Sequence, residues 1–412
     1  MDIRENNQAL KVLGLPASQG RWLLIPLGMT VLLCLGTVYS WSIFRNPLET
    51  ELNLSATESL FPYTIALVFY AGLMPIAGFL IPRLGTASVT AIGGILVGTG
   101  YILSSFAQNI VMLTFTYGVI VGTGVGITYG APMAVMARWF PDRKGLAVGL
   151  TIVGFGLSPL ITAPLAKGLI DRFQTRPTLL VLGIAFALII LAIAQTMKLP
   201  PKEWQQASAS ATATVATVNY PKNLFKSRSF YGLWLCYIIG TFVGLSAIGI
   251  SSPVGEEMIG IDAGVAATSV SMFALFNGLS RPLFGWLGDR FPPRYVAIGS
   301  YTLILIACIL MVNAQSGQVL TYLVAFCLFW FCLGGWLALA PIATLRLFNP
   351  DDYAQNYGIV FTAYGVGALL GTLIAGQIRD WFGSYTYAFY PMALLAIVGM
   401  FIASFMLKRD RN

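Results

Sequence analysis

Residues 276–290 read FNGLSRPLFGWLGDR, an apolar stretch interrupted by an arginine and a proline and closed by an acid–base pair. Residues 74–83, MPIAGFLIPR, align with residues 281–290 at shared Pro, Gly and Arg positions. A second pair of segments, RWFPD at 138–142 and RLFNPD at 346–351, repeats with almost the same separation. The chain therefore contains a parallel internal repeat, which indicates two halves of similar structure.

The composition indicates that both halves lie in a membrane. Of 412 residues, 57% are apolar and only 10% are charged, whereas about 25% are charged in soluble domains. A helix needs about 20 apolar residues to cross a bilayer, and six such runs occur in each half: 22–44, 59–82, 88–107, 110–137, 145–166, 178–197, then 229–251, 263–287, 295–314, 319–344, 355–377 and 385–407. We predict an all-α integral membrane protein with 12 transmembrane helices in two pseudo-symmetric six-helix halves.

The domain organisation follows from the same runs. Residues 1–197 form the first six-helix bundle, 198–228 a polar cytoplasmic linker rich in Ala, Ser and Thr, and 229–412 the second bundle. With the N-terminus inside, 18 of the 24 basic residues fall on one face, which places both termini in the cytoplasm. We expect a multi-pass protein of a plasma membrane, the inner membrane in a bacterium, and no cleaved leader.

Several classes of function are disfavoured by what the sequence lacks. Without any histidine there is no imidazole base and no HExxH metal site. The five cysteines lie inside apolar runs and form no CxxC pair. The net charge of +8 comes from short clusters between spans and does not indicate nucleic-acid binding. We expect no enzyme activity, no metal and no cofactor.

Five segments carry a family resemblance. Gly285, Asp289, Arg290 and Arg294 resemble the signature of the major facilitator superfamily, although the first-half copy has Pro82 at the acidic position. Residues 38–41, 124–130, 277–282 and 356–358 are similar to the oxalate/formate antiporter family, which includes bacterial monocarboxylate transporters. The resemblance implies the major facilitator fold and transport of small carboxylates by alternating access.

The resemblance also implies a binding site, with one departure. An oxalate exchanger of this family clamps its dianion between an Arg, which matches Arg281, and a Lys, whose position here is Tyr364. A tyrosine of the fifth helix becomes Phe155, and an aromatic pair of the tenth becomes leucines, with Trp336 nearby. One fixed charge in place of two favours a monocarboxylate over oxalate.

Arg281 is the strongest single signal in the sequence itself. It is the one basic residue inside a predicted span, where a guanidinium costs roughly 2.5 kcal/mol or more and does not face lipid. All 16 acidic residues fall in loops or at span ends, so an anionic substrate is the expected partner. The alternative is a hydrogen bond to backbone carbonyls freed by Pro282 or to a neighbouring tyrosine.

Other residues complete the predicted site. Asn277 lies one turn before Arg281 and can orient it or donate to a substrate oxygen, the alternative being a contact that joins helices. The phenols of Tyr39, Tyr129 and Tyr364 can hydrogen-bond a carboxylate, or can be satisfied by backbone carbonyls. Two further side chains form apolar walls or pack in the core: Phe155 and Trp336.

We predict that Asp289, Arg290 and Arg294 form a cytoplasmic gate, the alternative being a solvated charge cluster. The predicted function is secondary transport of lactate, pyruvate, formate or a similar monocarboxylate by a monomer in the lipid bilayer. Proton symport and anion exchange both remain open. An oxalate-type antiporter is the nearest alternative, and a channel or a transport-inactive receptor would belong to other classes.

Overall fold

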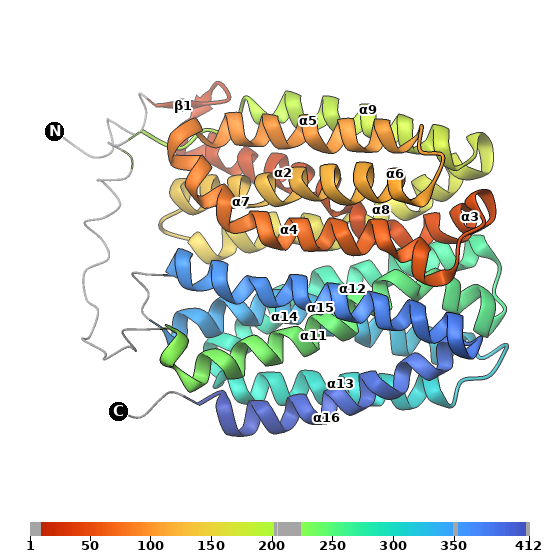
Figure 1. The fold of residues 1–412 in the computed structure, drawn as a ribbon. Coiled ribbons are helices and arrows are strands. Elements are labelled where there is room, and N and C mark those ends of the chain that lie inside the picture. Colours follow the sequence, from red (N-terminus) through yellow and green to blue (C-terminus); the bar gives the residue numbers. More distant parts are fainter. Residues whose placement is uncertain (1–9, 202–203, 205–223, 349–352, 409–412) are drawn as a thin grey trace.

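The computed structural model describes residues 10–201, 204, 224–348 and 353–408, and these residues form two bundles of long helices lying side by side (Figure 1). The first bundle contains α2 (Ala17–Gly36), η1 (Thr37–Ser40), α3 (Trp41–Leu52), α4 (Ala56–Leu84), α5 (Thr86–Ser104), α6 (Ile110–Leu113), η2 (Thr114–Val121), α7 (Gly122–Trp139), α8 (Lys144–Phe173) and α9 (Thr175–Ala194). A short hairpin, β1 (Lys11–Val12) and β2 (Leu15–Pro16), precedes it.

The second bundle contains η3 (Leu224–Lys226), α11 (Arg228–Pro253), η4 (Val254–Ile259), α12 (Ala263–Arg290), α13 (Pro293–Val312), α14 (Val319–Leu347), α15 (Tyr353–Phe382), η6 (Tyr385–Ala388) and α16 (Phe389–Met406). Most of the predicted linker lies outside the described residues.

The predicted fold class is confirmed: 12 helical segments are long and apolar enough to cross a membrane. The first of them is longer than predicted. It runs from Ala17 to Leu52 because α2, η1 and α3 follow one another without a loop. The prediction that Arg281 is the only basic residue within a span was therefore wrong, since Arg45 also lies inside a span and is fully buried.

Local sequence sets several helix ends. Ser55 and Glu58 form a reciprocal capping box at the start of α4. Asp262 accepts a hydrogen bond from the backbone N–H of Gly264 at the start of α12. Asn53 and Gly260 end α3 and η4 in the left-handed conformation. These capping residues mark where the helices begin and end.

The two bundles meet along two pairs of helices, α4 with α15 and α8 with α12, while α3 also contacts α11. The hairpin strand β1 and the C-terminal end of α16 lie at the same end of the molecule, here called the terminal end (Figure 1). The other is called the far end. Among the described residues, the hydrogen bonds between the two halves lie in one part of the interface. This part extends from the level of Ile152 in α8 to the far end.

Arg45 is the centre of the far-end contacts. Its guanidinium donates to Glu49 at 2.9 Å within its own helix. Across the interface it donates to the carbonyl of Gly249 at 3.2 Å and to the hydroxyl of Tyr385 at 2.9 Å. Breaking a buried charge pair is costly because the remaining charge is left without a partner. This network therefore holds the far end closed.

The carboxylate of Asp380 adds to the closure from the second half. It accepts from the backbone N–H groups of Ala56 and Thr57, each at 3.0 Å, at the start of α4. A carboxylate at a helix N-terminus is favourable because it meets unpaired N–H groups and the positive end of the helix dipole. Asn46 and Glu256 form a further contact between halves at 2.8 Å.

Arg45→Gln should open the far end more often, because Glu49 then lacks its cation and the contacts to Gly249 and Tyr385 weaken. Purified protein carrying Ser252→Cys should react with a maleimide about tenfold faster or more when Arg45→Gln is added. Ser252 is buried, and so are all five native cysteines. Arg172→Gln, at an exposed arginine at the end of α8, is the matched control and should leave the rate unchanged. Equal labelling in all three backgrounds would contradict the proposed closing role.

Candidate functional site

Six of the seven predicted binding residues come together at the interface between the halves, and all six are buried. The first half contributes three of them from η1, α7 and α8, and the second half three from α12 and α15: Tyr39, Tyr129, Phe155, Asn277, Arg281 and Tyr364. The 3-10 segment η1 interrupts the first span where Tyr39 lies. The predicted binding residues of the two halves thus lie together in one buried cluster.

The guanidinium of Arg281 is docked on the opposite half. It donates to the carbonyl of Ile152 in α8 at 2.8 Å and to the side-chain oxygen of Asn277 at 3.2 Å. The carbonyl is not one freed by Pro282, because it belongs to α8. In the described part of the chain no carboxylate pairs with Arg281, and its Nε has no hydrogen-bond partner. The charge is thus held by neutral groups only.

Gly156 makes this position possible. A Cβ at Gly156 would lie 2.7 Å from the side-chain oxygen of Asn277 and 3.1 Å from two nitrogens of Arg281. Any larger residue in α8 would therefore push Asn277 and Arg281 away from the interface. Sequence analysis did not identify Gly156, because nothing in the sequence shows which glycine faces the arginine.

Aromatic rings surround the polar groups. Phe155 makes edge-to-face contacts with Tyr39 at 5.1 Å and with Tyr129 at 5.2 Å. Tyr70 of α4 contacts Phe155, Tyr129 and Tyr364. Such rings exclude water and lower the local dielectric constant, which strengthens every electrostatic interaction of Arg281.

A hydrogen bond between the two halves crosses the aromatic cluster. The hydroxyls of Tyr39 and Tyr364 lie 2.8 Å apart. Each phenol therefore has a side-chain partner rather than a backbone carbonyl. Tyr364, at the position where the resemblance led us to expect a lysine in an oxalate exchanger, is thus a neutral group hydrogen-bonded to the first span.

The positions of two aromatic residues differ from what the sequence analysis expected: Trp336 lies outside the cluster, and Tyr70 lies inside it. Trp336 lies against Gly240 and Tyr301, and none of its ring contacts involves the six clustered residues. Tyr70 was missed, although the repeat alignment that pairs Met74 with Arg281 also pairs Tyr70 with Asn277. The repeat was therefore the signal that could have found it.

The predicted gate residues lie at the terminal end. Arg346 donates to the backbone carbonyls of Asp289 at 2.6 Å and Phe291 at 2.7 Å. Arg290 lies over the ring of Trp286, and Arg294 donates to the hydroxyl of Tyr295 at 2.7 Å. None of the three predicted residues forms an ion pair with a described residue. Their gating role stays a prediction.

Another loop, between α7 and α8 of the first half, does form an ion pair. Arg21 donates to both carboxylate oxygens of Asp142, at 2.6 and 2.9 Å. This hydrogen bonding lowers the pKa of Asp142 below its ordinary value. The loop between α7 and α8 is thereby tied to the start of the first span.

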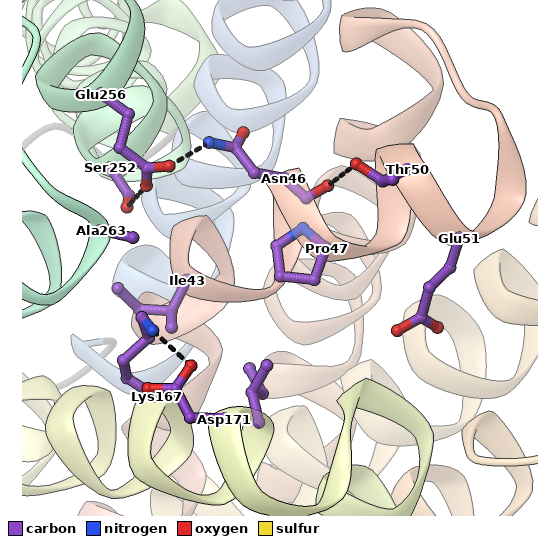
Figure 2. A pocket seen from close by; sticks show the side chains of 11 residues that line it. Ile43, Asn46, Pro47, Thr50, Glu51, Lys167, Asp171, Ser252, Glu256 and Ala263 are labelled. Atoms are coloured by element: carbon purple, nitrogen blue, oxygen red, sulfur yellow. Dashed lines mark hydrogen bonds and ion pairs between the residues drawn. The ribbon is translucent and has the colours of Figure 1, made fainter.

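A cavity of about 430 Å³ lies at the far end, between α3 and α8 of one half and α11, η4 and α12 of the other. Figure 2 shows Asn46 bonded to Glu256, and Lys167 paired with Asp171. The lining includes Glu51, so carboxylates outnumber the single ammonium. None of the predicted binding residues lines this cavity. Among described residues no group of three or more His, Cys, Asp or Glu is placed to hold a metal.

The comparison with protein families agrees with this architecture. The model of the Major Facilitator Superfamily matches residues 27–258 and 238–412. The chain belongs to this superfamily. The oxalate:formate antiporter of Oxalobacter formigenes is 29% identical over 394 residues, which cover 94% of this chain and 92% of the relative. Monocarboxylate transporter 12 of Mus musculus is 26% identical over 420 residues, covering 93% and 85%.

Solved structures show the same fold. A bacterial homologue of the human lysosomal transporter Spinster, in an inward-facing and occupied conformation, superimposes with a TM-score of 0.70 at 14% identity. The match covers 93% of this chain and 97% of that one. The resemblance stated from sequence is thus confirmed for the superfamily and for both kinds of carboxylate-transporter relative.

Gly156→Ala should abolish transport while the protein still reaches the membrane, because the added methyl displaces Asn277 and Arg281. The matched control is Gly168→Ala in the same helix, where an added Cβ meets nothing within 4 Å. Uptake by reconstituted protein measures both. Normal uptake by Gly156→Ala would show that the docked position of Arg281 is not needed for transport.

Proposed function

We propose that this major facilitator protein is a secondary active transporter of small monocarboxylates such as lactate, pyruvate or formate. The observation that carries the proposal is Arg281, a buried guanidinium at the interface of the two halves whose described partners are all neutral. A carboxylate can satisfy such a group by charge-assisted hydrogen bonds. An interface between two repeats is also where carriers of this type bind their substrates.

The number of charges supports a monoanion. A dianion in the same place would leave one negative charge without a counter-charge in a medium where burial of charge is costly. Tyr364 offers a hydroxyl but no charge, and Tyr39 already holds it. Lactate and pyruvate each carry one negative charge for Arg281 and one further oxygen that a neutral donor can bind.

The oxalate-type antiporter is the second candidate, because the relative from Oxalobacter formigenes covers almost the whole chain. Formate exchange would satisfy both proposals, whereas a preference for oxalate would require a second cation that we do not assign. A channel or a transport-inactive receptor would show no saturable exchange.

Alternating access provides the mechanism. With the far end closed by Arg45 and Asp380, substrate reaches Arg281 from the terminal end, displaces it from Ile152 and is released after the halves rock. We propose that the terminal end faces the cytoplasm of a plasma membrane, the inner membrane in a bacterium, and that the carrier acts as a monomer. Exchange of one carboxylate for another and symport with a proton both fit this cycle.

Arg281→Gln should be inactive, because the substrate then loses its only counter-charge. Arg281→Lys keeps the charge but lacks the planar fork and should transport poorly. We expect a loss of about 30-fold or more for Arg281→Gln, measured as counterflow of labelled lactate in proteoliposomes. The wild type should show saturable counterflow, which a channel or receptor would not. Full counterflow by Arg281→Gln, at equal membrane content, would remove Arg281 from the site.

Tyr364→Lys should shift the preference toward oxalate, because it adds a second cation to the cluster that contains Arg281. In competition against labelled lactate, oxalate should gain about tenfold relative to pyruvate. Tyr364→Phe is the control, since it removes the hydrogen bond to Tyr39 without adding charge and should not favour oxalate. If oxalate already competes best in the wild type, the monoanion assignment fails.

A further inference from the structure

The indole N–H of Trp330 is a buried donor that the predicted site did not include. Trp330 belongs to α14 and is fully buried, and its Nε1 has no hydrogen-bond partner among the described residues. A buried donor without a partner costs folding free energy, so its persistence calls for an explanation. Trp41, another fully buried indole, donates to the carbonyl of Ser59 at 2.9 Å.

Trp330 is joined to the site through Asn277. The amide nitrogen of Asn277 donates to the backbone carbonyl of Trp330 at 2.9 Å, and its amide oxygen accepts from Arg281 at 3.2 Å. The side chain of Asn277 therefore holds the guanidinium of Arg281 in a fixed position relative to Trp330 on α14. Of these two residues, each has one nitrogen left without a partner, Nε of Arg281 and Nε1 of Trp330.

The ring of Trp330 is also in contact with the aromatic cluster. Its centroid lies 6.4 Å from that of Tyr39 in an edge-to-face arrangement, and 6.1 Å from that of Phe273. Trp336 also has an unpartnered indole nitrogen, but its ring contacts Tyr237 and Tyr301 and none of the six clustered residues. Trp330 is thus the indole donor that the packing places beside Tyr39 and Asn277.

We propose that the indole N–H of Trp330 donates to the 2-oxygen of a 2-hydroxy or 2-oxo monocarboxylate whose carboxylate is held by Arg281. This inference rests on the proposed function and adds a substrate class to it. A site that hydrogen-bonds a substrate oxygen rejects an analogue without that oxygen, because the buried donor is then left unpaired. The carrier should therefore prefer lactate and pyruvate over propionate, which has the same carbon chain but no 2-oxygen.

The test compares binding of these acids to purified protein by ligand-dependent thermal stability. Trp330→Phe removes the donor and keeps an aromatic ring. It should weaken lactate and pyruvate about 5- to 10-fold while propionate changes by less than about twofold. Trp41→Phe is the matched control, because it changes a buried indole outside the cluster and should leave the lactate-to-propionate ratio unchanged.

Each outcome decides between the proposals. Equal weakening of all three acids by Trp330→Phe would overturn the role of Trp330 and leave the transporter proposal standing. Binding of no monocarboxylate by the wild type, together with absent lactate counterflow, would overturn the proposed function itself. If Trp330→Phe does not fold, the wild type still decides, since equal affinity for lactate and propionate would contradict a donor to the 2-oxygen.

Discussion

A positive charge without a negative partner, buried between two half-proteins, is the constraint on which this molecule depends. Arg281 is held by one carbonyl and one amide oxygen, which solvate the guanidinium but do not neutralise it. The arrangement is tolerable because the carbonyl of Ile152 comes from the opposite half and Gly156 allows the close approach. In the proposed mechanism, substrate would therefore bind the same guanidinium that joins the two halves, and would replace its bond to Ile152.

Arg45 shows the opposite solution to the same physical problem. It is equally buried but is paired with Glu49 and further bonded to Ser59, Gly249 and Tyr385. A charged group whose hydrogen bonds are all made within the protein binds a ligand weakly, but it stabilises the interface that supplies those bonds. The two arginines thus differ in role. Arg281 remains available to an anion, whereas Arg45 stabilises the conformation in which the far end is closed.

Much of the fold followed from sequence, because apolar run length and an internal repeat are strong local signals. Arg281 and Asn277 were also identifiable, since one turn of one helix separates them. Arg45 was missed because it lies beyond the apolar run, where polar residues still continue the helix and find partners 204 and 340 residues away. The pairing of Tyr39 with Tyr364, 325 residues apart, likewise depends on how the halves meet, which no local pattern states.

The 3-10 segment from Thr37 to Ser40 divides the first span into two helices that pack against different neighbours. The helix before it, α2, packs on α8 within its own half, whereas the helix after it, α3, also contacts α11 of the other half. A tighter, less regular turn inside a long helix is where such a helix bends most readily. The first span can therefore bend at η1, with α2 fixed in the first bundle and α3 moving with the second half. Tyr39 lies at this bend, so the movement would change its position in the proposed substrate site.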